Sequence, residues 1–459
     1  MSSTSLVSAA APRLAMHQAS MVAALRSVPG QLWLRQALIV IAAVLVTLTG
    51  LRSYQLFTQV AQTLGRDAVP SIVAAEQIRT RLADAHTQLM NVFLTREAEG
   101  PAMQAYRQTI AQAHDHLLTA SQNITYGDDE RGPILTTMTL LSDYERLVGR
   151  ALTIVDYSAA LGQADALMRG RILPAVAALD QANFKHLDVA WQDQKARAHA
   201  WLAGFIATAV LLVAVLIETQ LKLYATFRRI VNPALALALV AVVVVSLSFT
   251  VTALRTIEEI RSAKEDAFDS VHALSQAEAL AFTANAHESI FLLLHGRSEQ
   301  VLQADLFHAA AAHMFSAQLP PDGRLPADLK TLKGTGLMGD ELANITYDGE
   351  APLATTELQR WLDYVRIDAQ IRALEAAGQH AEAVALCLGT QPEQSDWAFE
   401  RFITALRATL QLNQDQFAST MARAYADAHR LGLLLIALLL VPLLGSVIGL
   451  RARLAEFRA

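Results

Sequence analysis

Residues 201–254, near the middle of the chain, constrain the fold more than any other stretch. They form an apolar run (201–217), a short basic connector and a second apolar run (234–254). Each run is about long enough to cross a hydrocarbon core of about 30 Å as an α-helix. Because the connector is too short to fold as a domain, the chain must enter one compartment and return directly. The segments on either side of this hairpin are therefore expected on the same side of a membrane.

The composition also indicates a membrane protein. The 459 residues are 53% hydrophobic and only 17% charged, which is less charge than a soluble protein of this size carries. Two further apolar runs, residues 37–51 and 431–450, bring the expected membrane spans to four. No run contains an internal Asp, Glu, Lys or Arg. Ion and proton pathways usually need such residues, so the sequence argues against a transporter.

Basic residues set the expected orientation. They precede the first span, occupy the connector and follow the last span, so the positive-inside rule places all three segments in the cytoplasm. The first run lacks a small-residue cleavage site and is expected to be an uncleaved anchor. We therefore expect a multi-pass plasma-membrane protein with both termini cytoplasmic. The basic residues are Arg13, Arg26 and Arg35, then Lys222, Arg228 and Arg229, and finally Arg451, Arg453 and Arg458.

The second half of the chain repeats the first. Paired segments occur in the same order at an offset that grows in two steps, which indicates an internal duplication with two insertions in the second copy. The insertions are expected at residues 319–339 and near 376–395. The pairs are Thr49–Arg52 with Thr252–Arg255, His86 with His287, Asn123–Tyr126 with Asn344–Tyr347, Asp143–Arg146 with Asp363–Arg366, and Asn183 with Asn413.

Helical periodicity predicts what each copy folds into. Apolar residues after the first span recur at spacings of 4, 3, 4 and 3, which is typical of a helix packed in a bundle. Further helices are expected over residues 102–121, from Pro133, and from about Ala164 into the second span. The predicted fold is all-α, with four transmembrane helices and two tandem extracytoplasmic four-helix bundles. The apolar seam consists of Ile78, Leu82, Ala85, Leu89 and Val92.

These assignments divide the whole chain. The expected segments are a cytoplasmic leader (1–35), transmembrane helices (36–57, 201–220, 234–254 and 431–450), extracytoplasmic bundles (58–200 and 255–430), a cytoplasmic connector (221–233) and a cytoplasmic tail (451–459).

Few residues are candidates for chemistry. The sequence has no Gly-rich phosphate loop, no protein-kinase motif set, no HExxH and no nucleophile elbow. We therefore expect no enzymatic activity, no catalytic residue, no cofactor and no metal site. His86 and His287 are interpreted as helix-face histidines kept by duplication. Cys387 is the only cysteine, so no disulfide forms within the chain, and a buried thiol is expected.

Three groups of residues are candidates for binding. Arg79 and Arg81 could meet a carboxylate ligand between the bundles, because the arginine fork binds two oxygens. The paired Asn-Ile-Thr-Tyr turns either shape the chain between two helices or form a surface for a partner, and both interpretations stay open. The basic connector is the candidate contact for a cytoplasmic effector. The residues of the turns and connector are Asn123, Tyr126, Asn344, Tyr347, Lys222, Arg228 and Arg229.

Membrane-anchored bundles of this kind resemble the sensor domains of bacterial chemoreceptors and sensor kinases. The tandem arrangement and three short stretches are similar to the GlnX-type membrane sensors of actinobacteria. That resemblance implies a receptor for an amino-acid-loaded periplasmic solute-binding protein, which signals to a cytoplasmic Ser/Thr kinase. The stretches are Val28-Pro29-Gly30, Ile172-Leu173-Pro174-Ala175 and Asn413-Gln414-Asp415-Gln416-Phe417.

The sequence therefore favours a non-enzymatic transmembrane sensor. We expect its long helices to shift when a solute is detected, a separate cytoplasmic effector kinase to respond, and the chain to form a homodimer that binds no nucleic acid. Two alternatives stay open, a structural or adhesion stalk and an accessory subunit of a transporter.

Overall fold

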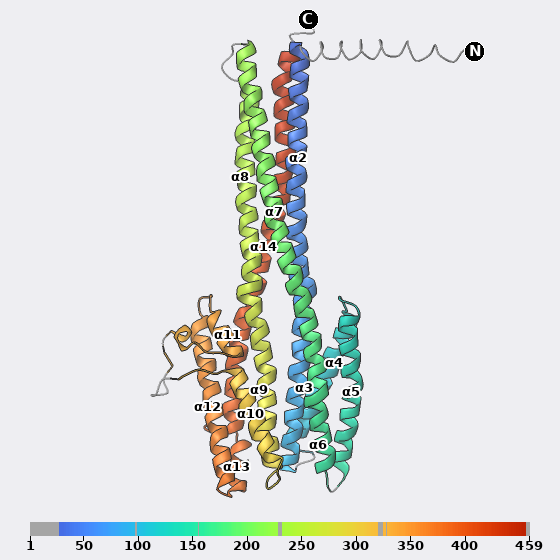
Figure 1. Cartoon of the computed structure of the whole chain (residues 1–459), viewed down its shortest axis with the longest axis vertical. Coiled ribbons are helices and arrows are strands. Elements are labelled where there is room, and N and C mark those ends of the chain that lie inside the picture. The colour runs from blue at the N-terminus through green and yellow to red at the C-terminus, as the bar shows by residue number, and fades with distance from the viewer. Residues whose placement is uncertain are drawn as a thin grey trace, which may run out of the picture. The chain divides into compact units, whose positions relative to one another are not determined.

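The computed structural model describes residues 27–96, 99–154, 156–227, 232–319, 325–326 and 328–455. Over these residues the chain is helical, apart from connecting turns and an isolated β-bridge between Ser316 and Thr335. The all-α prediction is confirmed (Figure 1).

The chain divides into two compact units. Unit 1 combines the residues up to Ala61, Trp191–Glu259 and the residues from Ala422, and unit 2 combines Gln62–Ala190 and Ile260–Met421.

Unit 1 is built from parts of four long helices, α2 (Val28–Gln62), α7 (Leu173–Phe227), α8 (Pro233–Arg261) and α14 (Ser395–Ala455). Each of the four helical stretches that contain them is long and apolar enough to cross a membrane, which confirms the four apolar helices predicted from the sequence. Their common core includes Phe205 and Phe249, whose ring centroids lie 4.1 Å apart. Much of the remaining apolar surface of these helices is exposed, as expected for helices that face lipid.

Small residues let the helices of unit 1 approach closely. A Cβ atom on Gly50 would lie 2.4 Å from Leu435, and one on Gly445 would lie 2.4 Å from Ala238. Membrane helices use small residues in this way, because close backbone approach increases van der Waals contact. The hydroxyl groups of Thr49 and Thr208 also form a hydrogen bond of 2.9 Å between α2 and α7.

The first half of unit 2 continues from α2. A π-helical turn, η1 (Thr63–Ala68), leads into α3 (Val69–Thr95), followed by α4 (Pro101–Gln122), α5 (Asp128–Thr153), α6 (Ser158–Leu167), a second π-helical turn η2 (Met168–Ile172) and the beginning of α7. The predicted seam of α3 is confirmed, since all its residues are at most 2% exposed. The seam consists of Ile78, Leu82, Ala85, Leu89 and Val92.

Two helix starts in this half differ from the prediction. The third helix begins at Asp128 rather than Pro133, because its first turn holds three acidic residues that suit a helix N-terminus, and Pro133 lies inside it. The fourth helix begins at Ser158 rather than near Ala164.

The second half of unit 2 is more elaborate. It contains η3 (Ser262–Phe268), α9 (Asp269–Leu293), α10 (Gln300–Met314), η4 (Leu329–Leu332), α11 (Leu337–Ala343), α12 (Glu350–Ala376), α13 (His380–Cys387) and the beginning of α14. Both regions predicted as insertions contain short helical elements, with η4 and the start of α11 in the first and α13 in the second. Cys387 is 2% exposed, which confirms the expected buried thiol.

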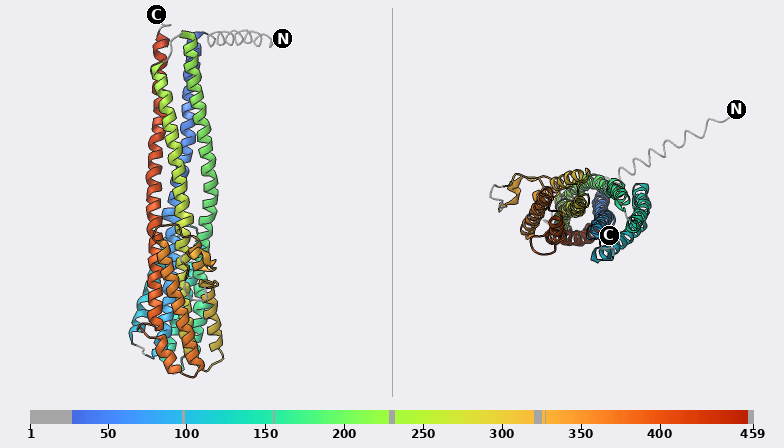
Figure 2. Two further views of the ribbon diagram at one scale, coloured as in Figure 1. Left: turned by 90° about the vertical axis from the view of Figure 1, so that its left-hand side faces the viewer. Right: turned by 90° about the horizontal axis from the view of Figure 1, so that it is seen from below.

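The two halves of unit 2 pack against each other through α3 and α9, which lie side by side (Figure 1 and Figure 2). Ala83 of α3 belongs to the hydrophobic cluster of the second half, and Ile290 of α9 belongs to that of the first. Thr87 donates a hydrogen bond to the carbonyl oxygen of Phe282 (2.8 Å), and Ser289 donates one to Oδ1 of Asn91 (2.7 Å). These hydrogen bonds fix how α3 and α9 are aligned along each other.

Candidate functional site

The two Asn-Ile-Thr-Tyr turns are held by equivalent glutamates. Glu130, in the first turn of α5, is 2% exposed, and its Oε2 accepts the backbone N–H groups of Thr125 and Tyr126. In the second copy, Oε2 of Glu350 accepts the N–H groups of Thr346 and Tyr347 (2.8 and 3.1 Å). Neither glutamate was predicted from the sequence. The sequence did contain a signal: a glutamate follows Tyr126 by four residues and Tyr347 by three. A carboxylate at the start of a helix can accept hydrogen bonds from the free N–H groups there.

The asparagines of the two turns have different surroundings. Nδ2 of Asn344 donates to the carbonyl oxygens of Glu265 and Asp266 (3.2 and 3.0 Å) and to Oγ of Ser270 (2.9 Å), which fastens the turn to η3 and α9. The side chain of Asn123 is exposed and forms no hydrogen bond with any described residue. Asn344 therefore fastens the second turn to η3 and α9, whereas Asn123 makes no such contact in the first turn.

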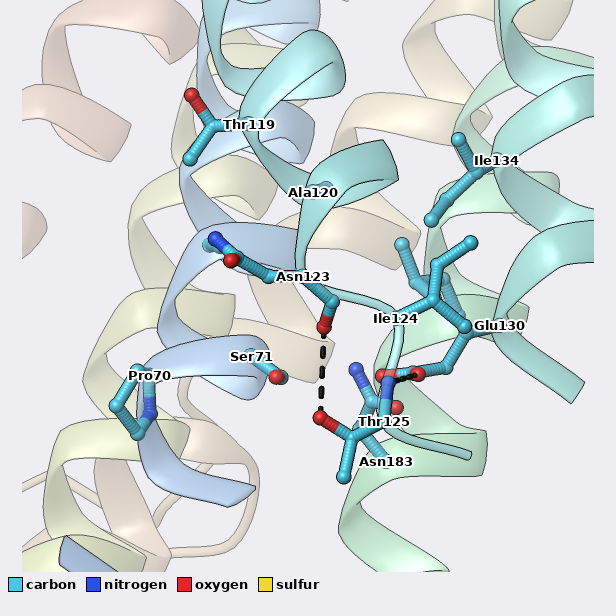
Figure 3. A pocket seen from close by; sticks show the side chains of 12 residues that line it. Pro70, Ser71, Thr119, Ala120, Asn123, Ile124, Thr125, Glu130, Ile134 and Asn183 are labelled. Atoms are coloured by element: carbon cyan, nitrogen blue, oxygen red, sulfur yellow. Dashed lines mark hydrogen bonds between the residues drawn. The ribbon is translucent and has the colours of Figure 1, made fainter. Parts of the chain in front are cut away.

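A cavity of about 470 Å³ lies beside the first turn (Figure 3). Its wall comes from the start of α3, the end of α4, the turn, the start of α5 and α7. Asn183, on α7, is 1% exposed, and its Oδ1 has no hydrogen-bond partner among the described residues. The polar lining consists of Ser71, Thr119, Asn123, Thr125, Glu130 and Asn183, and the apolar lining of Pro70, Ala74, Ala120, Ile124, Ile134 and Leu179.

The chemistry of this cavity suits an uncharged polar group. No Lys, Arg or His lines it, and the one carboxylate, Glu130, already accepts two backbone N–H groups. Asn123 and Thr125 are exposed, so the cavity opens to solvent beside the turn. A small molecule could enter there and reach the buried carbonyl oxygen of Asn183.

The tyrosines of the two turns lie against neighbouring helices. Tyr126 stacks on the ring of His186 on α7, with centroids 4.5 Å apart and an interplanar angle of 9°. His186 in turn pairs with Asp129 over 2.9 Å. The hydroxyl of Tyr347 donates to the carbonyl oxygen of Ser262 over 3.3 Å. Both rings thus help to hold their turns.

The two predicted arginines, Arg79 and Arg81, have different surroundings. Nη1 of Arg79 lies 3.6 Å from Oε1 of the buried Glu76. Arg81 lines a second cavity, of about 220 Å³, where α3 meets α9 and α14, and forms no hydrogen bond or ion pair with any described residue. Arg407 lines the same cavity and binds Glu278 through Nε and Nη2 (2.8 and 2.7 Å). Of the predicted pair, only Arg81 has an uncommitted guanidinium group.

The predicted cytoplasmic contacts are only partly described. Lys222 is exposed near the end of α7, whereas Arg228 and Arg229 lie outside the described residues.

Comparison with known families gives a match over the first half of unit 2. Residues 60–192 match the actinobacterial sensor domain family. Comparisons with curated proteins and with solved structures found no match. Every residue that lines the cavity beside Asn123 falls within the matched segment. The match supports a sensor role for this part of the chain.

Proposed function

We propose that the chain is a transmembrane sensor that detects an extracytoplasmic solute and signals to a separate cytoplasmic effector. In this proposal the four apolar helices span the plasma membrane, and the duplicated halves of unit 2 are tandem bundles outside the cell. The observation that carries the proposal is the cavity beside Asn123, because all of it lies in the segment that matches a sensor domain family.

The contacts of Asn344 in the second copy suggest which chemical group a ligand of the first copy would carry. There a primary carboxamide, that of Asn344, donates to two backbone carbonyl oxygens and one hydroxyl on the neighbouring helix. In the first copy the corresponding Asn123 is exposed, makes none of these contacts and lines the cavity. We propose that a ligand with a carboxamide group makes the missing contacts from the cavity. The cavity lining offers a carboxylate ligand no cation, so an acidic group is disfavoured.

An amino acid with a side-chain amide, such as glutamine or asparagine, fits this description. Its amide would enter the cavity and its charged ends would remain near the solvent-exposed Asn123 and Thr125. Following the resemblance to GlnX-type sensors, we further propose that a solute-binding protein delivers the amino acid. Arg81, which lines the second cavity and not the first, is available to a carboxylate of the carrier protein.

Helix α7 offers a route for the signal. It carries Leu179 and Asn183 of the cavity, continues through the second apolar run and reaches Lys222. A shift or rotation of about 1–2 Å along such a helix is a known form of transmission. We propose that a cytoplasmic Ser/Thr kinase reads the change through Lys222, Arg228 and Arg229.

Ligand binding can be tested on the purified full-length chain in detergent. Thermal unfolding is measured with glutamine, asparagine, glutamate and aspartate, for the wild type and for Ala74→Leu, which fills the cavity. Ala111→Leu makes the same change at an exposed position of α4 away from the cavity. We expect the amides alone to stabilise the wild type and Ala111→Leu, and no stabilisation of Ala74→Leu. Binding that survives Ala74→Leu would place the ligand elsewhere.

The partners need a separate experiment. The detergent-solubilised protein is captured with and without an amino-acid mixture, co-purifying proteins are identified by mass spectrometry, and the mass of the complex gives its subunit number. We expect a homodimer with a solute-binding protein and a kinase. Recovery of the chain alone would favour a stalk, and recovery of transport components would favour an accessory subunit.

A further inference from the structure

A buried cluster of three metal-ligating side chains lies where the two halves of unit 2 meet. Glu76 comes from α3, Asp180 from α7 and His272 from α9, and one ligand atom from each lies within 4.8 Å of the others. Nε2 of His272 is 3.0 Å from both carboxylate oxygens of Asp180. Glu76 and Asp180 are 2% and 4% exposed. We infer that this cluster binds a transition-metal dication, although the sequence alone predicted no metal site.

Glu76 provides the independent reason for a cation. Neither of its oxygens has a hydrogen-bond partner among the described residues, and both are buried. Its ion-pair partner is Arg79, at 3.6 Å, which is long for a hydrogen-bonded ion pair, and the arginine side chain is 25% exposed. Two buried acidic side chains and one partly solvated guanidinium therefore lie together, and none of these groups forms a hydrogen bond with the oxygens of Glu76. A metal ion would give the oxygens of Glu76 the ligand they lack.

The donor set selects the class of metal. One imidazole nitrogen with two carboxylates suits Zn²⁺ or Mn²⁺, whereas Mg²⁺ prefers oxygen ligands and retained water. Gln276, one helical turn after His272, places its amide 3.0 Å from Nε2 of His272 and 3.3 Å from Oδ2 of Asp180. With the amide turned over, its carbonyl oxygen would supply a fourth ligand.

Phe184 supports the histidine. Its ring stacks on the imidazole of His272 with centroids 4.4 Å apart and an interplanar angle of 13°, which fixes the direction of Nε2. Groups that orient a ligand in this way raise metal affinity. Since the ligands come from both halves of unit 2, a bound ion would fasten α9 to α3 and α7.

A second cluster serves as an internal comparison. His295 and His380 both bind Glu375, and Gln300 donates to the same carboxylate over 3.0 Å. These groups already satisfy one another, and both histidines are considerably more exposed than Glu76. This cluster therefore needs no ion to account for its geometry.

The test uses the full chain purified with an affinity tag that lacks histidine and stripped of metal with a chelator. Zn²⁺, Mn²⁺ and Mg²⁺ are titrated while heat release and thermal unfolding are measured, and bound Co²⁺ is followed by its visible absorption. We expect one Zn²⁺ per chain, a higher melting temperature with Zn²⁺ or Mn²⁺, and little effect of Mg²⁺.

Matched variants locate the ion. Glu76→Gln and His272→Gln should each lower Zn²⁺ affinity by about tenfold or more and change the Co²⁺ spectrum, while His380→Gln should leave both unchanged. Circular dichroism of each metal-free variant shows whether it is folded. The absence of any Zn²⁺ binding by the wild type would overturn the inference, as would binding that survives Glu76→Gln but disappears in His380→Gln. Because the amide-ligand test uses a different cavity, either proposal can fail alone.

Discussion

Asn413 donates a hydrogen bond from Nδ2 to Oε1 of Glu350 over 3.0 Å, between two side chains that are fully buried. The other oxygen of this carboxylate accepts the backbone N–H groups of Thr346 and Tyr347. One side chain thus joins α14, α12 and the turn between α11 and α12. If the turn left this position, the backbone N–H groups of Thr346 and Tyr347 would lose their acceptor.

Replacement of Glu350 should destabilise the second half of unit 2. Glutamine has the same shape, but its amide has one acceptor where the carboxylate has two, so at least one of the three donors loses its partner. We expect Glu350→Gln to lower the free energy of unfolding by about 2 kcal/mol. Glu382→Gln, at an exposed position of α13, should change it little. Equilibrium unfolding followed by circular dichroism measures both, and equal stabilities would contradict this account of the turn.

The two copies of the turn provide a paired experiment. Asn344→Ala removes a side chain that donates to three acceptors, and we expect a loss of about 1–2 kcal/mol. Asn123→Ala removes an exposed side chain with no hydrogen bond to a described residue, so a change below about 0.5 kcal/mol is expected. Thermal and denaturant unfolding of both variants under the same conditions compares them. A larger loss for Asn123→Ala would mean that the first turn is docked in solution.

The sequence predicted features that depend on local periodicity. The apolar spacing from Ile78 to Val92 identified the buried face of α3, because residues four and three apart share one side of a helix. The two Asp-Tyr-x-Arg segments follow the same helical periodicity. Tyr144 and Tyr364 are fully buried, while Asp143 and Asp363 pair with arginines on the exposed faces.

Other features depend on contacts between distant helices and could not be predicted in this way. Identical tetrapeptides place Asn344 against η3 and α9 but leave Asn123 exposed beside a cavity, and the tetrapeptide sequence alone does not distinguish the two. Glu76, Asp180 and His272 belong to three helices that are far apart in the chain, so no spacing relates them. The start of α5 was misplaced because Pro133 was a stronger local signal than the acidic residues before it.

His287 should make stability depend on pH. Burial lowers the pKa of His287 to about 4 from its ordinary value of 6.5, although its hydrogen bond with Gln303 acts in the opposite direction. Arg169 and His86 lower this pKa further, and Asp165 raises it. Between pH 6.5 and about 4 the unfolded chain binds a proton that the folded chain does not. The contribution of His287 to stability is therefore full above pH 6.5 and falls as the pH decreases toward 4.

The pH dependence can be isolated by substitution. Unfolding free energies of the wild type and His287→Gln are compared from pH 4 to 8, with His313→Gln as the exposed control. We expect the difference between wild type and His287→Gln to change across this range by on the order of 3 kcal/mol. His313→Gln should follow the wild type. A pH-independent difference for His287→Gln would show that this histidine is not held neutral by burial.

Gly445 tests the packing of the four apolar helices. A Cβ atom there would meet Cβ of Ala238 at 2.4 Å and the carbonyl oxygen of Ala234 at 3.3 Å, so a larger side chain must push α14 away from α8. Overpacking of this kind costs about 1–3 kcal/mol. Gly204, on α7, has no neighbouring atom within 4 Å of the same position, and its replacement by valine carries a similar change in helix propensity. We expect Gly445→Val to melt at a clearly lower temperature in detergent than Gly204→Val. Equal melting temperatures would mean that α8 and α14 do not approach each other at Gly445.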